Sequence, residues 1–196
     1  MSKIVIIDYG AGNIQSVKYA LNRLGVDAIL TADAEVIKNA DKVIFPGVGR
    51  AQFAMEKLAK AGLDKLIPTL TQPVLGVCLG MQLMCKHTAE DDTKGLGIFP
   101  VEVKEFEKTL KVPQIGWNQI SELKGDLFTD VDENSFTYFV HSFYIPDNEF
   151  SIASTNYGFK YSSAIQKDNF YATQFHPEKS GDVGEKILLN FLSINN

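Results

Sequence analysis

Short apolar runs alternate with helix-like segments through the first half of this 196-residue sequence, and this alternation limits the folds open to it. Strand-like runs lie at 4–8, 42–45 and 73–75, and helix-like spacing lies at 14–24 and 52–61. Each of these helix-like segments is followed directly by a glycine, a residue favoured just after helix C-termini. The alternation predicts an α/β fold with a mostly parallel central sheet flanked by helices, and with functional residues at the carboxyl ends of the strands.

The second half of the sequence is richer in β-branched and aromatic residues and in turns. Residues 136–143 have this composition, and 162–166 and 170–175 flank a short loop that is typical of a hairpin. A helix-like segment returns at 183–192. We therefore expect an antiparallel β extension in the C-terminal half. No linker, low-complexity run or internal repeat interrupts the sequence, which predicts a single domain over 1–196.

Bulk properties exclude several classes of partner. The formal net charge of -5 argues against a nucleic-acid-binding protein. The sequence has no apolar segment near the length of a membrane helix, and its first residues lack the long apolar region of a signal peptide. On one helix, Cys78 and Cys85 would lie about 10 Å apart, too far for a disulfide, and no cluster of cysteine and histidine indicates a metal. These features predict a cytoplasmic protein without a metal site.

Cys78 has the sequence context of a nucleophile. Glycines lie two positions before it and two positions after it, between an apolar strand-like run and a segment through Cys85 that we expect to be helical. This is the layout of a nucleophile elbow, in which a tight, strained turn exposes the reactive atom and glycines let neighbouring backbone approach. A helix N-terminus also stabilises a thiolate. A buried structural cysteine is the alternative, but the two glycines favour the nucleophile.

A nucleophilic thiol needs a base and a third group that orients the base. His176 is the best candidate base, because it follows a strand-like run and precedes a proline, which favours an extended conformation. Glu178 lies two positions on, and alternate residues of an extended chain face the same way, so its carboxylate can hold the imidazole. We expect His87 to be solvated, whereas His141 could be structural or could line the site. The sequence predicts a triad of Cys78, His176 and Glu178.

Acyl chemistry also needs hydrogen-bond donors for a developing oxyanion. The backbone N–H of Leu79, directly after the nucleophile, is one expected donor. The second is expected from the loop 46–49, which carries two glycines and which we expect to end the strand at 42–45. Alone, this loop could be an ordinary turn, but the order of the strands predicts that it lies beside Cys78.

Gly10 and Gly12 form a weak match to a dinucleotide-binding fingerprint. Gln15 occupies the position of the third glycine, and no convincing acidic residue ends a second strand. We therefore expect no nicotinamide cofactor, and the sequence indicates no other cofactor. A tight turn or a contact surface is the simpler explanation for these glycines.

Several motifs together resemble a known enzyme family. The segments 76–82, 46–49 and 174–178 resemble the signatures of triad-type (class I) glutamine amidotransferases. Four further segments resemble, more narrowly, the glutaminase subunits of imidazole glycerol phosphate synthase: 8–13, 113–118, 138–144 and 176–180. The resemblance runs from the first strand to the last helix, so it covers essentially the whole chain.

The resemblance implies a glutaminase mechanism. Cys78 would attack the side-chain amide carbon of glutamine, while backbone N–H groups of Val48 and Leu79 hold the oxyanion. His176 would protonate the leaving ammonia and then activate water to hydrolyse the thioester, and Glu178 would orient His176. The resemblance also implies a set of residues that contact the substrate: Gly49, Gln82, Glu90, Ser142 and Phe143.

The resemblance further implies a heterodimer, in which ammonia passes to a separate cyclase subunit with a (β/α)₈ barrel. That subunit makes imidazole glycerol phosphate and aminoimidazole carboxamide ribotide in histidine biosynthesis. The residues suggested for the interface are Asn13, Trp117, Tyr144 and Lys179. From chemistry alone, Trp117 could fill the core and Lys179 could be a solvated charge. We also expect glutaminase activity to depend on the partner, through reorientation of the peptide before Val48.

Other functions remain open at this point. The chain could supply ammonia for pyridoxal phosphate, anthranilate or guanylate synthesis, although the segments around Trp117 and Tyr144 argue against these pathways. A stand-alone cysteine hydrolase of γ-glutamyl peptides would need no partner. A non-catalytic regulatory subunit that kept the fold is disfavoured, because all three triad residues are present.

Overall fold

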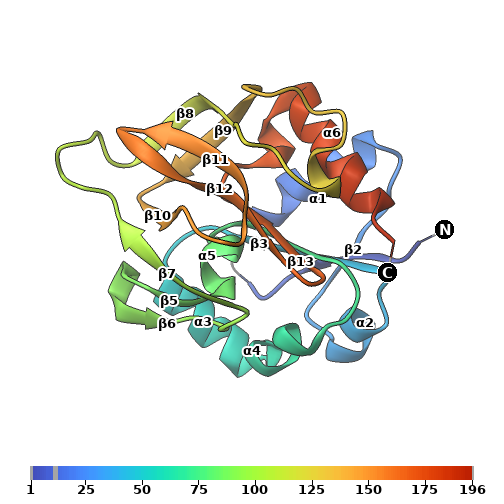
Figure 1. Cartoon of the computed structure of the whole chain (residues 1–196). Helices are drawn as coiled ribbons and strands as arrows, with labels where there is room; N and C mark the ends of the chain where they lie inside the picture. Colours follow the sequence, from blue (N-terminus) through green and yellow to red (C-terminus); the bar gives the residue numbers. More distant parts are fainter. Residues whose placement is uncertain (1, 11–12, 196) are drawn as a thin grey trace.

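Parallel strands at the centre of the molecule place a strand from near the C-terminus beside a strand from the first half of the chain (Figure 1). The computed structural model describes residues 2–10 and 13–195. The parallel strands lie in the order β2, β1, β3, β4, β13, with the bounds Ile29–Thr31, Ile4–Ile7, Lys42–Gly47, Val74–Cys78 and Phe170–Thr173. Because β13 pairs in parallel with β4, the residues that follow these two strands meet at one edge of the sheet.

Beyond β13 the sheet continues with mainly antiparallel strands. The order runs from β13 through β12 (Phe159–Lys167), β10 (Phe143–Pro146), β7 (Phe99–Glu105), β5 (Cys85–Thr88) and β6 (Thr93–Lys94), and β11 (Ser151–Tyr157) pairs with β12. A separate antiparallel pair consists of β8 (Gln114–Gln119) and β9 (Phe136–His141). The predicted α/β fold with an antiparallel extension is therefore confirmed.

Helices cover both faces of the parallel strands (Figure 1). One face carries α1 (Ile14–Arg23) and α6 (Gly181–Ser193); the other carries α2 (Ala34–Lys38), α3 (Ala51–Lys60), α4 (Leu63–Leu66) and α5 (Leu79–Met84). Side chains of β1 alternate between the two faces, so Ile4 and Ile6 join one core while Val5 and Ile7 join the other. The 3₁₀ turns η1 to η4 span Ile67–Thr69, Glu90–Asp92, Asp126–Phe128 and Pro177–Lys179.

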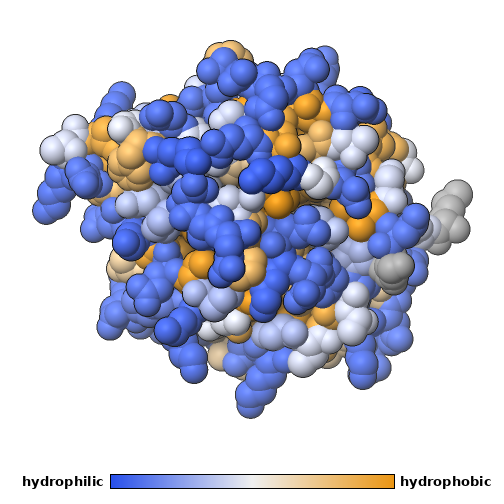
Figure 2. All heavy atoms as spheres, in the orientation of Figure 1, coloured by the Kyte–Doolittle hydropathy of each residue, from blue (hydrophilic) through white to orange (hydrophobic). Residues whose placement is uncertain are grey.

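The outer surface is mainly polar on the face shown in Figure 2, with smaller hydrophobic areas between hydrophilic side chains. Both cysteines are free, and they lie on different elements. Within the described residues, no helix has the length and apolar character needed to cross a membrane.

Two sequence-based boundaries near the site are wrong. The helix that follows β4 ends at Met84, and Cys85 begins β5, where it pairs with Phe99; the expected helix through Cys85 does not form. Pairing with β7 takes precedence there over helical spacing. Strand β3 continues through Pro46 and Gly47 instead of stopping before them, since a proline near a strand end removes only one ladder donor.

Other differences are smaller. Strand β4 extends to Cys78, β13 ends at Thr173, and the expected strand over 136–143 is broken at Ser142 between β9 and β10. The expected hairpin is confirmed, because Lys167 pairs with Phe170 across a two-residue loop. The expected turn or contact role of the early glycines falls partly on residues 11 and 12, which lie outside the described residues.

Helix α5 approaches β3 so closely that only glycine fits at Gly80, where a Cβ would overlap the carbonyl oxygen of Phe45. We expect Gly80→Ala to lower the free energy of unfolding by about 3 kcal/mol or more, because the helix must move away from the sheet. Gly25→Ala is the control: Gly25 has φ +77° but open space around its Cβ position, so about 1–2 kcal/mol is expected from backbone strain alone. Chemical unfolding measures the free energy of unfolding of both variants. Equal losses in Gly80→Ala and Gly25→Ala would contradict the close approach of α5 to β3.

Candidate active site

Cys78 occupies a strained turn between β4 and α5. Its backbone angles, φ 54° and ψ -109°, are unfavourable for a residue with a side chain. Neighbouring glycines make room for the turn. A Cβ on Gly76 would lie 2.9 Å from the sulfur of Met84, and a Cβ on Gly47 would lie 2.7 Å from the backbone nitrogen of Gly80. The backbone around this cysteine is therefore packed as closely as a nucleophile elbow requires.

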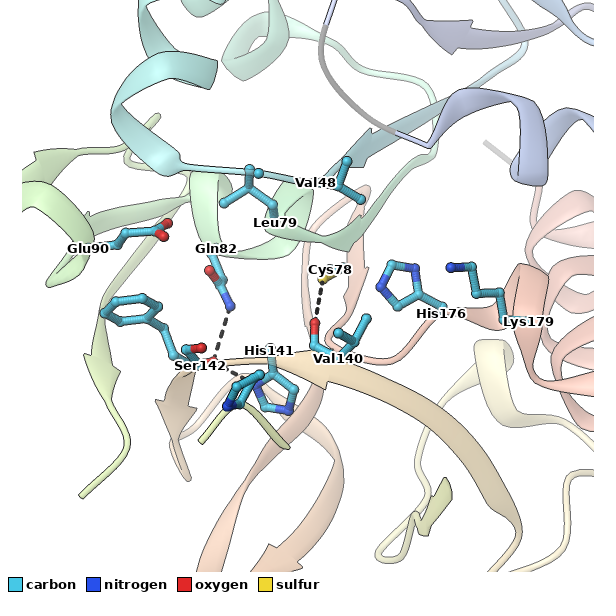
Figure 3. Close-up of a pocket in the computed structure, with 13 residues that line it drawn as sticks. Val48, Cys78, Leu79, Gln82, Glu90, Val140, His141, Ser142, His176 and Lys179 are labelled. Atoms are coloured by element: carbon cyan, nitrogen blue, oxygen red, sulfur yellow. Dashed lines mark hydrogen bonds between the residues drawn. The ribbon is translucent and has the colours of Figure 1, made fainter. Parts of the chain in front are cut away.

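His176 and Glu178 lie together beside the Cys78 turn, although they come from the far end of the chain. His176 Nδ1 is 2.8 Å from Glu178 Oε1, and each side chain is only 2% exposed. His176 has φ -95° and ψ 96°, the extended conformation expected before Pro177. The Ser180 hydroxyl donates a hydrogen bond of 2.6 Å to the His176 carbonyl, which fixes the backbone further. His176 and Cys78 line the same cavity (Figure 3).

Charges around His176 keep its imidazole protonated at neutral pH. Burial alone would lower the pKa of His176, but the charge of Cys78 and the hydrogen bond and charge of Glu178 raise it to about 10. Nδ1 faces Glu178, whereas Nε2 has no partner that meets hydrogen-bond geometry, so Cys78 acts mainly through its charge. The site therefore holds an imidazolium, with a proton on Nε2, beside the sulfur of Cys78.

The loop after β3 lies beside the Cys78 turn, as the strand order predicted. Gly47, at the end of β3, pairs in register with Cys78. Val48 is 38% exposed, and it lines the cavity together with Leu79, the first residue of α5. Gly49 has φ +96°, a region in which other residues are strained. Both backbone segments expected to supply oxyanion donors thus face one cavity.

Side chains hold both ends of this loop. The buried Tyr9 hydroxyl donates a hydrogen bond of 3.2 Å to the carbonyl of Pro46, where the loop begins. At the other end, Glu90 Oε2 accepts a hydrogen bond of 2.9 Å from the backbone nitrogen of Ala51, the first residue of α3. Burial raises the pKa of the Glu90 carboxyl, and the hydrogen bond from Ala51 partly opposes this shift. The segment between these anchors is short and rich in glycine.

A cavity of about 310 Å³ opens over Cys78, a size that suits a small-molecule ligand (Figure 3). Most of the residues expected at the site line this cavity: Val48, Gly49, Cys78, Leu79, Gln82, Glu90, Ser142, Phe143, His176 and Lys179. Glu178 does not line the cavity; it supports His176 from behind. The structure thus brings together residues from α5, η2, the β9–β10 junction and the segment after β13.

Gln82 is already hydrogen-bonded within this wall. Its Nε2 donates to the carbonyl of Phe143 at 3.1 Å and to Oε1 of Gln174 at 2.9 Å. Gln174 Nε2 lies 3.8 Å from the sulfur of Cys78, and the sulfur is 3.7 Å from the carbonyl of Val140. These contacts link the elbow helix, β9 and the segment after β13 around one sulfur atom.

Sequence reasoning assigned no role to several residues of this region. Pro113 and Val140 line the cavity, and Gln174 contacts the sulfur of Cys78. The two-residue period of an extended chain could have placed Gln174 on the same side as His176. Pro113 and Val140 lie within the segments 113–118 and 138–144 that carry the resemblance, but neither has a reactive side chain to suggest a role, and both reach the site through tertiary packing.

The residues suggested for an interface lie mostly outside the cavity. Trp117 is 55% exposed on β8, so the core-filling alternative is wrong. Its ring lies 6.0 Å from that of Tyr138 on β9, and Lys179 Nζ lies 5.9 Å from the same Tyr138 ring. Tyr144 stacks on a neighbouring phenylalanine, and Asn13 is half-buried just before α1. Lys179 alone among the four also lines the cavity.

Within the part of the chain that the structure describes, no group of three or more histidine, cysteine, aspartate and glutamate side chains is arranged to hold a metal ion. A thiol on a strained turn, beside an imidazole paired with a buried carboxylate, is the arrangement of cysteine-dependent acyl-transfer enzymes. The α/β fold and the residues of this cavity therefore define the class of the protein: it is an α/β enzyme of the cysteine-dependent acyl-transfer type.

Comparisons with known proteins narrow the class. The family model described as "Glutamine amidotransferase class-I" matches residues 5–194. The protein named imidazole glycerol phosphate synthase subunit HisH from Bacteroides fragilis (strain YCH46) is 56% identical over 195 residues, which cover 98% of this chain and 100% of that protein. The HisH subunit from Pectobacterium atrosepticum is 46% identical over 197 residues, with the same coverage. The chain belongs to the class-I glutamine amidotransferase family and, within it, to the HisH subunits.

Solved structures agree at the level of the fold. The crystal structure of a putative GMP synthase subunit from Thermoplasma acidophilum superposes with a TM-score of 0.74 and 23% identity, covering 98% of this chain and 92% of that one. A second crystal structure, described as a glutamine amidotransferase, has a TM-score of 0.75 and 18% identity, covering 96% of each chain.

Removal of the Cys78 sulfur should lower the pKa of His176. In Cys78→Ala the charge contributed by Cys78 is lost while burial and Glu178 remain, so the pKa of His176 should fall below the wild-type value of about 10. NMR titration of the His176 ring measures the change. Cys85→Ala is the control, because Cys85 is buried on β5 and contributes nothing to this shift. An unchanged His176 titration in Cys78→Ala would contradict the proposed electrostatic coupling.

Proposed function

We propose that this chain is the glutaminase subunit of an imidazole glycerol phosphate synthase and hydrolyses glutamine to glutamate and ammonia in histidine biosynthesis. Relatives with 46–56% identity over 98% of the chain support this function and favour it over the pyridoxal phosphate, anthranilate and guanylate pathways. The observation that carries the mechanism is the buried His176–Glu178 pair beside Cys78. Both cysteines are free, which supports the reducing cytoplasm as the location.

The first half of the reaction forms a thioester. The Cys78 thiolate attacks the side-chain amide carbon of glutamine, and backbone N–H groups of Val48 and Leu79 stabilise the negative oxygen of the tetrahedral intermediate. His176 then donates its Nε2 proton to the amide nitrogen, so the carbon–nitrogen bond breaks and ammonia leaves. Glu178 holds the imidazole in place through Nδ1.

The second half hydrolyses the thioester. Neutral His176 removes a proton from a water molecule, whose oxygen attacks the thioester carbonyl within the same oxyanion site. The carbon–sulfur bond breaks, the thiolate of Cys78 returns, and glutamate is released. The high pKa of His176 favours its protonated state at the start of each turnover. The ring can then supply the proton that the amide nitrogen needs to leave as ammonia.

We propose that glutamine lies along the cavity with its amide at Cys78 and its α-amino and α-carboxylate groups toward Gln82 and Glu90. Figure 3 supports this direction, since Gln82 and Glu90 lie at the opposite end of the cavity from His176. The carboxylate of Glu90 suits an ammonium group, although one of its oxygens also binds Ala51. Backbone groups of Gly49, Ser142 and Phe143 complete the proposed contacts.

Loss of the nucleophile should separate the two activities of the complex. Cys78→Ala should lower glutamine-dependent synthesis by at least about 10⁴-fold, while synthesis from added ammonia continues. Cys85→Ala removes the other thiol and should keep both activities. Product formation is measured in the complex with the cyclase. Equal loss of both activities in Cys78→Ala would contradict a role confined to glutamine hydrolysis.

We propose that the partner is a (β/α)₈-barrel cyclase and that the outer face of β8–β9 contributes to the heterodimer interface. Ile115, Trp117 and Phe136 are 63%, 55% and 52% exposed on these two strands. Exposed apolar side chains gathered on one face favour a protein contact. Val140 pairs directly with Ile115 and lines the cavity, so ammonia released at Cys78 has a short route to this face. Three further contacts are proposed: Asn13, Tyr144 and Lys179.

We also propose that the partner completes the oxyanion site by reorienting the peptide between Gly47 and Val48. The anchors at Pro46 and Ala51 support a movement confined to the few residues between them. The positive φ of Gly49 supplies the backbone freedom for such a rotation. Docking against the exposed Val48 side chain would couple the partner to this peptide.

A titration with the cyclase tests the surface and the coupling together. Glutaminase activity should rise with cyclase concentration, and Trp117→Ala should shift the curve to concentrations at least about tenfold higher. Ile29→Ala is the control, because Ile29 is exposed at the amino end of β2, at the far edge of the sheet. Full glutaminase activity of the isolated chain would contradict the proposed dependence on the partner. Identical activation curves for Trp117→Ala and Ile29→Ala would contradict the proposed interface on β8–β9.

A further inference from the structure

His141 lies in the wall of the cavity, and both of its ring nitrogens are engaged. Nδ1 is 2.7 Å from the carbonyl oxygen of Phe143, and Nε2 is 3.2 Å from the hydroxyl of Tyr161. The Tyr161 hydroxyl is in turn 2.9 Å from the side-chain amide of Gln114. All three polar side chains are buried. The reaction steps above use none of them, so their arrangement needs another reason.

The position of the proton on His141 follows from its neighbours. A carbonyl oxygen can only accept, so Nδ1 must donate to Phe143. A second proton on Nε2 would bury a charge among the rings of Phe106 and Phe139, at 5.2 and 5.7 Å, with the imidazolium of His176 nearby. Burial and the charge of His176 lower the pKa of His141 to about 4, although the hydrogen bond to Phe143 acts to raise it. The ring is therefore neutral at pH 7, and Nε2 is an acceptor.

This tautomer sets the direction of the remaining hydrogen bonds. Tyr161 must donate its hydroxyl proton to His141 Nε2, so its oxygen is free to accept from Gln114. With Gln114 Oε1 facing the hydroxyl, Gln114 Nε2 is buried without a partner. A half-turn of the amide exchanges the two atoms and satisfies the donor. The four groups then form one directed chain, from Gln114 through Tyr161 and His141 to the carbonyl of Phe143.

We propose that His141 is a positioning residue for the glutamine site: its Nδ1–H fixes the Phe143 carbonyl and so holds the backbone of 140–143 against Cys78 and Gln82. This inference rests on the proposed function. Gln82 Nε2 donates to the same carbonyl at 3.1 Å, and the carbonyl of residue 140 is 3.7 Å from the sulfur. The backbone between these two points is the part proposed to contact glutamine. Loss of its fixed position should therefore weaken glutamine binding more than it slows the chemical step.

Glutamine kinetics of the complex with the cyclase test the proposal. His141→Leu removes both ring nitrogens and should raise KM for glutamine about tenfold or more, with kcat changed by less than about threefold. His141→Asn keeps an amide N–H close to the position of Nδ1 and should return KM to within about threefold of wild type. A purely structural role would reduce the folded, active fraction and leave KM unchanged. An unchanged KM in His141→Leu, or no recovery in His141→Asn, overturns the proposal.

Protonation of His141 can be read without glutamine. Long-range ¹H–¹⁵N NMR of the full chain at pH 7 should show a neutral ring with its proton on Nδ1. In Tyr161→Phe the ring packing remains but the hydroxyl is lost, so the Nε2 resonance should shift while Nδ1 stays protonated. An imidazolium, or a proton on Nε2 alone, in the wild type overturns the proposed chain. Failure of the proposed function is distinguishable, because the wild-type complex would then not hydrolyse glutamine at all.

Discussion

The left-handed backbone of Cys78 is the constraint on which the rest of the site depends. Such a conformation costs about 1–3 kcal/mol and persists only where surrounding structure enforces it. Here β4 is paired on both sides, with β3 and β13, and α5 is packed against Phe45 through Gly80. The same pairings determine the neighbours of the sulfur. Strand β3 leads into the loop with Val48, and β13 leads into His176.

Two histidines face one cavity, and their surroundings drive their pKa values in opposite directions. His176 is buried, but the charges of Cys78 and Glu178 more than offset its desolvation and keep it protonated. His141 is also buried, but its partners are a carbonyl and a hydroxyl, so desolvation prevails and the ring is neutral. Such a division gives one ring a proton to transfer and the other a fixed hydrogen-bond direction.

Local patterns in the sequence carry most of the fold and the reactive residues. The alternation of apolar runs predicted β1, β3 and β4, and the glycines around Cys78 predicted a turn that the packing at Gly80 explains. Strand β2 was not predicted, and β13 was expected only as part of the antiparallel extension, although it pairs in parallel with β4. The pattern failed at Cys85, because pairing with β7 overrides helical spacing. The anchoring of Ala51 by Glu90 also escaped prediction. Such contacts join residues distant in sequence and depend on how the elements pack.

The most direct test of the account is the identity of the covalent intermediate. The chain, in complex with its cyclase, would be mixed with glutamine, quenched in acid within one turnover and digested for mass spectrometry. The account predicts a glutamyl thioester on the peptide that contains Cys78 and none on Cys85, with the adduct absent from Cys78→Ala. Rapid glutamine hydrolysis with no adduct on Cys78, or with the adduct on Cys85, would contradict it.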